Sequence, residues 1–243
     1  MSKVNLTIAA LLITTFTATG FSTELIGFSR ILSTNEAEAR ETPPKVNSQI
    51  SSLNDVVILF GKQPRKGGGR EVICTIAPLP PAFAINSPNV FVSDRPTFIW
   101  QGAANRIEVR QAEDEKLIWG KDLKPQESVA TYPISGQALL PNQKYELRLL
   151  TSNDETKIVF QVASLDQRQR IQAGLQDQVK QLAAAQRTPA AIAVKQAIYL
   201  GEQKLWADAF GKVFSVKQSE IPKNEQAGWS RSLTEIRSSV CGS

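Results

Sequence analysis

The hydrophobic pattern of the chain changes its period once, near Ser164, and this change constrains the fold more than any other feature. Before Ser164, apolar residues alternate with polar ones in short runs, as they do in strands with one buried face. After it, apolar residues recur every three or four positions, as in helices with one apolar stripe. The sequence therefore predicts an α+β protein, with a β-rich domain over residues 90–163 and a helical domain over residues 164–243.

The β-rich segment contains about seven short alternating runs between Val90 and Val162. In one of them, for example, Tyr145, Leu147 and Leu149 share a side. Turn-forming residues follow each other so closely that antiparallel hairpins are favoured over crossover helices. We expect a small antiparallel β-sandwich, similar in architecture to immunoglobulin or fibronectin type III domains.

The helical segment shows start signals at Ser164, which can form a capping box with Gln167, and at Thr188, which a proline follows. Four helices are expected: Gly201 would end the second, and the last would begin after Pro222. The second and third resemble one tetratricopeptide-type hairpin, with an isolated helical bundle as the alternative. One such hairpin cannot bury its own apolar face, so other helices or the sandwich must cover it.

Residues 1–39 have the form of a secretory signal peptide, because Lys3 precedes an uncharged, largely apolar run from Val4 to Thr23. Cleavage is expected after Ala39, with a second, weaker site after Gly20. An uncleaved membrane anchor is the alternative, and it would provide the only contact with the membrane. The expected location is therefore periplasmic or secreted.

Cys74 and Cys241 are the two cysteines of the chain, and export allows them to form one disulfide or to remain two thiols. The chain has no histidine. This excludes a Ser-His-Asp triad, a Cys-His pair and a histidine-ligated zinc site. No catalytic residue, metal ligand or cofactor is predicted, although a hydrolase that uses two carboxylates remains a distant third function.

Residues 40–89 are expected to form a linker, a short strand at Val56–Phe60, a flexible basic loop at Gly61–Arg70 and an irregular proline-rich stretch from residue 75. The loop lacks the spacing of a phosphate-binding P-loop. The net charge of +5 is modest, and no basic stretch alternates with aromatic residues, so nucleic-acid binding is not predicted. Glu113-Asp114-Glu115 is expected to be a solvated hairpin turn.

The stretch from Ala190 to Phe214 has more apolar and aromatic residues than one helix stripe requires. Tyr199, Trp206 and Phe210 are therefore the predicted partner-binding residues. The leading function is a non-enzymatic, periplasmic protein-interaction module of a bacterial envelope. The alternative is a glycan-binding accessory protein, whose sugar platform would need aromatic residues that instead lie on the apolar side of their strands.

Four landmarks occur in a fixed order: the basic glycine-rich segment and Cys74, the strand Arg95-Pro96-Thr97-Phe98-Ile99-Trp100, the turn and strand Leu140–Leu147, and the helical Trp206-Ala207-Asp208-Ala209. Together they resemble a family of uncharacterised exported proteins of cyanobacteria, defined by a domain of unknown function. The resemblance spans residues 65 to about 216. This chain lacks the second cysteine that some members would carry near Tyr145, and the resemblance implies a compartment and an architecture but no chemistry.

Overall fold

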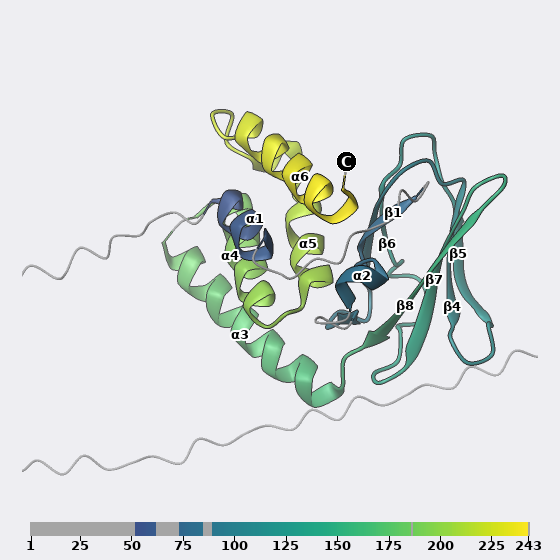
Figure 1. Cartoon of the computed structure of the whole chain (residues 1–243). Coiled ribbons are helices and arrows are strands. Elements are labelled where there is room, and N and C mark those ends of the chain that lie inside the picture. Colours follow the sequence, from purple (N-terminus) through teal and green to yellow (C-terminus); the bar gives the residue numbers. More distant parts are fainter. Residues whose placement is uncertain (1–51, 62–72, 85–88, 186, 243) are drawn as a thin grey trace, which may run out of the picture. The chain divides into compact units, whose positions relative to one another are not determined.

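The computed structural model of the chain describes residues 52–61, 73–84, 89–185 and 187–242 (Figure 1). The predicted signal region and the basic loop after Gly61 lie outside these residues. Along the described chain the helices and strands are α1 (Leu53–Gly61), β1 (Cys74–Ala77), α2 (Pro81–Ala84), β2 (Val90–Phe91), β3 (Thr97–Gln101), β4 (Arg106–Gln111), β5 (Leu117–Asp122), β6 (Val129–Thr131), β7 (Lys144–Leu150), β8 (Glu155–Val162), α3 (Leu165–Ala184), α4 (Pro189–Glu202), α5 (Trp206–Phe214), a 3₁₀ turn (Gln218–Glu220) and α6 (Gln226–Cys241).

The strands form two sheets, one of three strands in the order β1-β3-β6 and one of five in the order β2-β8-β7-β4-β5. Seven of the strands lie between Val90 and Val162, the number predicted, in a stretch that the structure describes without a gap. The strand pairs are antiparallel except for β2, which runs parallel to β8 over two residues. The predicted α+β class is therefore confirmed.

The apolar sides of the two sheets share one core. Phe98 of β3 lies 5.6 Å, between ring centroids, from Phe160 of β8 and 6.3 Å from Trp119 of β5. Phe91 of β2 makes edge contacts with both phenylalanines. Alternating large residues on β3, β5 and β8 thus point at the facing sheet, which is the packing that their period of two predicts.

The predicted strand at Val56–Phe60 is wrong, because these residues belong to helix α1. Leu53, Val56 and Phe60 are buried on one side of the helix, at helical spacing, while Ile58 is exposed. A short apolar run does not distinguish a strand from a buried helix by period alone. α1 packs against α4 and α6, so this segment joins the C-terminal helices although more than a hundred residues separate them.

The stretch from residue 75, expected to be irregular, instead contributes strand β1, which pairs with β3 from Cys74 to Ala77, and the short helix α2. β1 is an outer strand of the three-stranded sheet. It also contacts α5 and α6. Its residues therefore connect the sheets to the helices.

Both predicted helix starts are confirmed. The Ser164 hydroxyl accepts a hydrogen bond from the Gln167 amide at the start of α3, and the Thr188 hydroxyl accepts one from the Ala191 amide at the start of α4. Gly201 does not end α4, which continues to Glu202. A Cβ at Gly201 would lie 2.8 Å from the Trp206 ring, so this glycine permits the close packing of α4 on α5.

Three links join the helices to the sheets. A disulfide pairs Cys74 of β1 with Cys241 of α6, with a Cα–Cα distance of 5.8 Å. The Asp208 carboxylate of α5 accepts a hydrogen bond of 2.7 Å from the Val92 amide, just after β2. In the same loop Asp94 forms a 2.9 Å ion pair with Arg168 of α3. Figure 1 shows the result, with the end of α6 beside β1.

Candidate functional site

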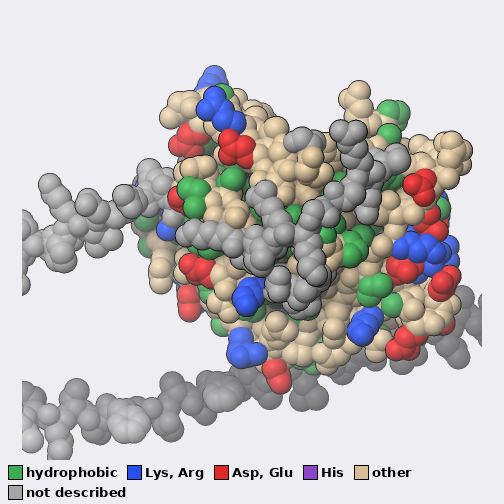
Figure 2. All heavy atoms as spheres, viewed as in Figure 1, with side chains coloured by type: hydrophobic (Ala, Val, Ile, Leu, Met, Phe, Trp, Pro, Cys, Tyr) green, Lys and Arg blue, Asp and Glu red, His purple; other side chains and the backbone are tan. Residues whose placement is uncertain are grey.

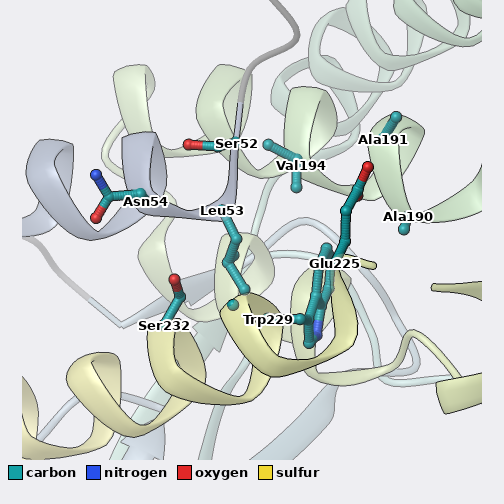
Figure 3. A pocket seen from close by; sticks show the side chains of 10 residues that line it. Ser52, Leu53, Asn54, Ala190, Ala191, Val194, Glu225, Trp229 and Ser232 are labelled. Atoms are coloured by element: carbon teal, nitrogen blue, oxygen red, sulfur yellow. The ribbon is translucent and has the colours of Figure 1, made fainter. Parts of the chain in front are cut away.

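The first turns of α1, α4 and α6 meet around a pocket of about 360 Å³ (Figure 3). Each helix contributes residues at or next to its amino-terminal end, because α1 begins at Leu53, α4 at Pro189 and α6 at Gln226. The volume lies within the range of small-ligand sites, about 300–1,000 Å³. The pocket is lined by Ser52, Leu53, Asn54, Ala190, Ala191, Val194, Glu225, Gly228, Trp229 and Ser232.

The walls of the pocket are mostly apolar. Leu53 points from α1 toward α6, where the buried Trp229 lies, and Val194 borders the pocket from α4 (Figure 3). Ala190, Ala191 and Gly228 are small residues of the lining. A Cβ at Gly228 would meet no heavy atom within 4 Å. Gly228 therefore leaves room at the first turn of α6 that a side chain would fill.

Two polar side chains in the pocket are unpartnered within the described residues. Ser232 is only 8% exposed, yet its hydroxyl has no hydrogen-bond partner there, and it points toward α1 in Figure 3. Glu225, the residue before α6, is exposed and extends toward α4, and its carboxylate makes no ion pair in the described part of the chain. Glu225 is also the one charged residue among those lining the pocket.

A hydrolase that uses two carboxylates, the third function considered from the sequence, would need two acidic residues in the pocket. A glycoside hydrolase needs two carboxyl groups, which stand roughly 5–10 Å apart. The pocket lining provides only Glu225. In the part of the chain that the structure describes, no group of three or more Cys, Asp or Glu residues is placed to hold a metal ion.

Trp206 and Phe210, two of the three predicted partner-binding residues, are 1% and 0% exposed, and their assignment to a binding surface is wrong. Phe60 of α1 packs edge-on against both rings, with centroids 5.2 and 5.0 Å away. α5 also contacts β1 and β3. The additional apolar residues of α5 are therefore buried inside the molecule by α1, a helix that the sequence pattern did not predict.

Tyr199, the third predicted residue, lies half-buried on α4, where it packs on α3. A Cβ at Gly174 would stand 2.2 Å from its hydroxyl oxygen, so the tyrosine occupies the space that this glycine leaves. Tyr199, Trp206 and Phe210 all lie outside the pocket lining. Trp229 and Gly228, which do line the pocket, were not among the residues predicted from the sequence.

The aromatic residues considered for a sugar platform belong to the core or pack against it, and for Trp100, Trp119 and Tyr145 the alternation of their strands predicted this. Trp100, Tyr132 and Tyr145 are buried, and Trp119 is half-buried against Tyr132. A flat aromatic surface for stacking sugars is therefore not present at these positions.

The outer side of the five-stranded sheet carries charges that neutralise one another. Glu108 accepts hydrogen bonds from Arg106 and Arg110, while Arg148 pairs with Glu146 and with Glu115 of the β4–β5 turn, which is the predicted acidic hairpin turn. Burial raises the pKa of Glu108, but the two arginines together outweigh burial and hold its pKa below the ordinary value. Figure 2 shows basic and acidic side chains side by side at this edge of the molecule.

A second hollow, of about 370 Å³, follows α3. Leu175 and Val179 form its half-buried floor, and glutamine and lysine side chains, among them Lys180 and Lys212, form the rest. Long side chains of this kind change rotamer freely, so the hollow lacks the fixed walls of the pocket at α1, α4 and α6.

Comparisons of the chain with protein families, with curated proteins and with solved structures returned no match. Within the described residues, every helix is too short or too polar to cross a membrane.

Proposed function

We propose that this protein is a non-enzymatic, periplasmic or secreted interaction module of a bacterial envelope, and that the pocket between α1, α4 and α6 is its binding site. The proposal depends on one observation above others: three helix ends hold open a pocket with apolar walls and unpartnered polar groups. Sites that combine such walls with a small number of oriented polar groups are typical of ligand and partner recognition. The signal-like segment at residues 1–39 supports the compartment.

The arrangement of the strands supports a relation to immunoglobulin-like domains. If β1, β3 and β6 are strands A, B and E, the other sheet reads A′-G-F-C-C′, the order of that architecture. Tyr145, at the start of β7, accepts a 2.8 Å hydrogen bond from the Leu140 amide. This contact is similar to that of a tyrosine corner, in which a tyrosine hydroxyl bonds to the backbone a few residues upstream. Such domains often carry recognition surfaces, an analogy of fold that does not define a ligand.

The pairing of α4 with α5 supports the relation to a tetratricopeptide hairpin, because Gly201 lets the two helices pack closely at the Trp206 ring. In this proposal α1 and α6 take the place of the neighbouring repeats that a single hairpin needs. Membership of the exported cyanobacterial family remains part of the proposal on the strength of its four ordered landmarks.

Glycan binding is the second candidate. Trp229 lines the pocket together with the hydroxyls of Ser52 and Ser232 and the amide of Asn54. Because the Trp229 ring is only 6% exposed, hydrogen bonds to the hydroxyl and amide groups, rather than stacking, would hold a sugar.

Site-specific photocrosslinking in the envelope tests the proposal. The photoreactive residue p-benzoylphenylalanine replaces Gly228, where the pocket has room for a side chain. The control carries it at Ala227, which is exposed on the same helix and does not line the pocket. We expect a discrete protein adduct from position 228 and none from position 227. Adducts of equal yield at both positions, or none at either, would contradict the proposal, and a glycan adduct would establish the second candidate in its place.

A further inference from the structure

We propose that the disulfide between Cys74 and Cys241 is a redox-operated clamp on the end of α6. When a protein dithiol reduces the bond, the last turn of α6 separates from β1 while the rest of the fold persists. This inference concerns regulation of the fold. It goes beyond the binding function proposed above and does not depend on what the pocket binds.

The position of the bond makes it a link between one helix end and one strand. Cys241 is the last residue of α6, and Gly242, in a left-handed conformation, ends the helix directly after it. Cys74 is the first residue of β1, an outer strand of the three-stranded sheet. The main contacts of α6 are with α1 and β1. The bond therefore fastens the carboxyl-terminal end of α6 to the sheet, where Figure 1 shows it beside β1.

The last turn of α6 has little else to hold it. Within this helix, which the structure describes throughout, Val240 is the one buried side chain after Ile236. Arg237 adds a contact with the Phe214 ring, 5.1 Å from the ring centroid. A helix end with few buried apolar contacts opens locally at a low cost in free energy. The disulfide prevents this opening, so breaking it should release the turn.

The remaining structure is held by contacts that do not involve α6. Asp208 of α5 accepts the Val92 amide, and Arg168 of α3 pairs with Asp94. Phe60 of α1 packs against the aromatic rings of α5. These contacts join α1, α3 and α5 to one another and to the sheets. Reduction should therefore change one end of one helix rather than unfold the chain.

Both cysteines are half-buried, so the bond is not enclosed by the core. Thiol–disulfide exchange requires access to one of the two sulfur atoms, and exposed disulfides are the labile ones that serve regulation. The accessibility of Cys74 and Cys241 thus fits a bond that is broken and formed again in the folded protein.

A protein dithiol carries out the reduction without a further reactant. One of its thiolates attacks a sulfur of the bond and forms a mixed disulfide, while the other cysteine of the chain leaves as a thiolate and takes up a proton. The second thiol of the reductant then attacks the mixed disulfide and releases the remaining cysteine as a thiol. Two electrons and two protons thereby pass to Cys74 and Cys241, and the reductant ends as a disulfide.

The first part of the experiment tests whether the bond can be reduced in the folded chain. The full oxidised chain is incubated with the dithiol dithiothreitol, with and without urea, and free thiols are then labelled with a maleimide and counted by mass spectrometry. We expect both cysteines to be labelled without urea. Labelling that requires urea would mean that the fold encloses the bond, and it would overturn the proposal.

The second part follows hydrogen exchange of the oxidised and the reduced chain. We expect the amides of residues 237–242 to exchange at least roughly tenfold faster after reduction, and those of α5 and β7 to exchange at an unchanged rate. Cys241→Ser should show the fast exchange without a reductant, and dithiothreitol should not alter it further. Unchanged exchange in residues 237–242 would overturn the clamp. Faster exchange throughout α5 and β7 would also overturn it, because the bond would then hold the whole fold.

Discussion

Asp208 illustrates how one residue of the sequence motif Trp-x-Asp-Ala acts in the fold. It lies in the first turn of α5, where its carboxylate accepts the Val92 amide and so links a helix to the loop after β2. Burial raises the pKa of this carboxyl from its ordinary value of 3.8 to about 6, although the Val92 and Ser93 amides and the charge of Lys212 act in the opposite direction. A partly buried acid with this shift makes stability depend on pH.

Because the pKa of Asp208 is higher in the folded than in the unfolded chain, its protonation stabilises the fold fully below pH 3.8, and this stabilisation is lost as pH rises through about 6. The difference amounts to at most about 3 kcal/mol. Asp208→Asn keeps an acceptor for Val92 and cannot ionise. As the pH rises from about 4 to about 7, the free energy of unfolding of the variant should increase relative to that of the wild type by up to this amount. Urea unfolding at the two pH values measures the difference. A stability difference that is the same at both pH values would contradict this account.

Gly201 and Gly228 are both helical, and the same substitution should affect them in opposite directions. Alanine favours a helix over glycine by about 1 kcal/mol. At Gly201 the new methyl group would lie 2.8 Å from the fully buried Trp206 ring, whereas at Gly228 it would meet nothing. We expect Gly201→Ala to lower the free energy of unfolding by about 1–3 kcal/mol and Gly228→Ala to raise it by up to about 1 kcal/mol. Denaturant titration measures both, and equal effects would mean that the close contact at Trp206 is absent.

At the scale of elements, helix α1 decides whether the C-terminal helices form a closed unit. Phe60 is 1% exposed between Trp206 and Phe210, whereas Ile58 of the same helix is 51% exposed. Phe60→Ala should lower the free energy of unfolding by about 3–5 kcal/mol, as for other buried phenylalanines. Ile58→Ala should change it by only about 0.5 kcal/mol. If the two variants lose the same stability in thermal unfolding, α1 is not packed in the core.

Elements that depend on local chemistry could be predicted from the sequence. Ser164 and Thr188 cap α3 and α4 through hydrogen bonds to residues three positions away, and the strands of the β-rich segment follow from alternation. α1 could not be predicted in this way, because nine residues with three consecutive β-branched members suit a strand as well as a helix. The helical structure of this segment depends on Phe60, which packs against Trp206 and Phe210 of α5.

The candidate site could not be predicted from the sequence either, because it also depends on contacts between distant segments. Its residues come from segments around Leu53, Ala190 and Trp229, which come together only when the whole chain folds. The apolar surplus around Trp206 was a real signal, but it indicated the packing site of α1 rather than a surface for a partner.

At the scale of the whole molecule, the disulfide joins the two kinds of structure. Cys74 and Cys241 close a loop of 167 residues, and chain entropy credits such a closure with about 5 kcal/mol at most. Replacing both cysteines by serine should lower the free energy of unfolding by up to that amount, while the remaining links at Asp208 and Arg168 keep the fold. Urea unfolding of the two proteins measures the loss. A reductant that leaves the unfolding midpoint of the wild type unchanged would show that the bond does not contribute.

The proposed binding role of the pocket belongs to the scale of the whole molecule, because α1, α4 and α6 form the pocket only when they pack together. The most direct test is the dissociation constant of the protein captured by crosslinking at position 228, measured for the wild type, for Gly228→Leu and for Ala227→Leu. The two variants place the same side chain at adjacent positions of α6, inside and outside the pocket. If the partner binds in the pocket, Gly228→Leu should weaken its affinity by roughly tenfold or more, or about 1.4 kcal/mol. Ala227→Leu should leave the affinity at the wild-type value. Equal affinities for the wild type and Gly228→Leu, with both proteins folded, would contradict it.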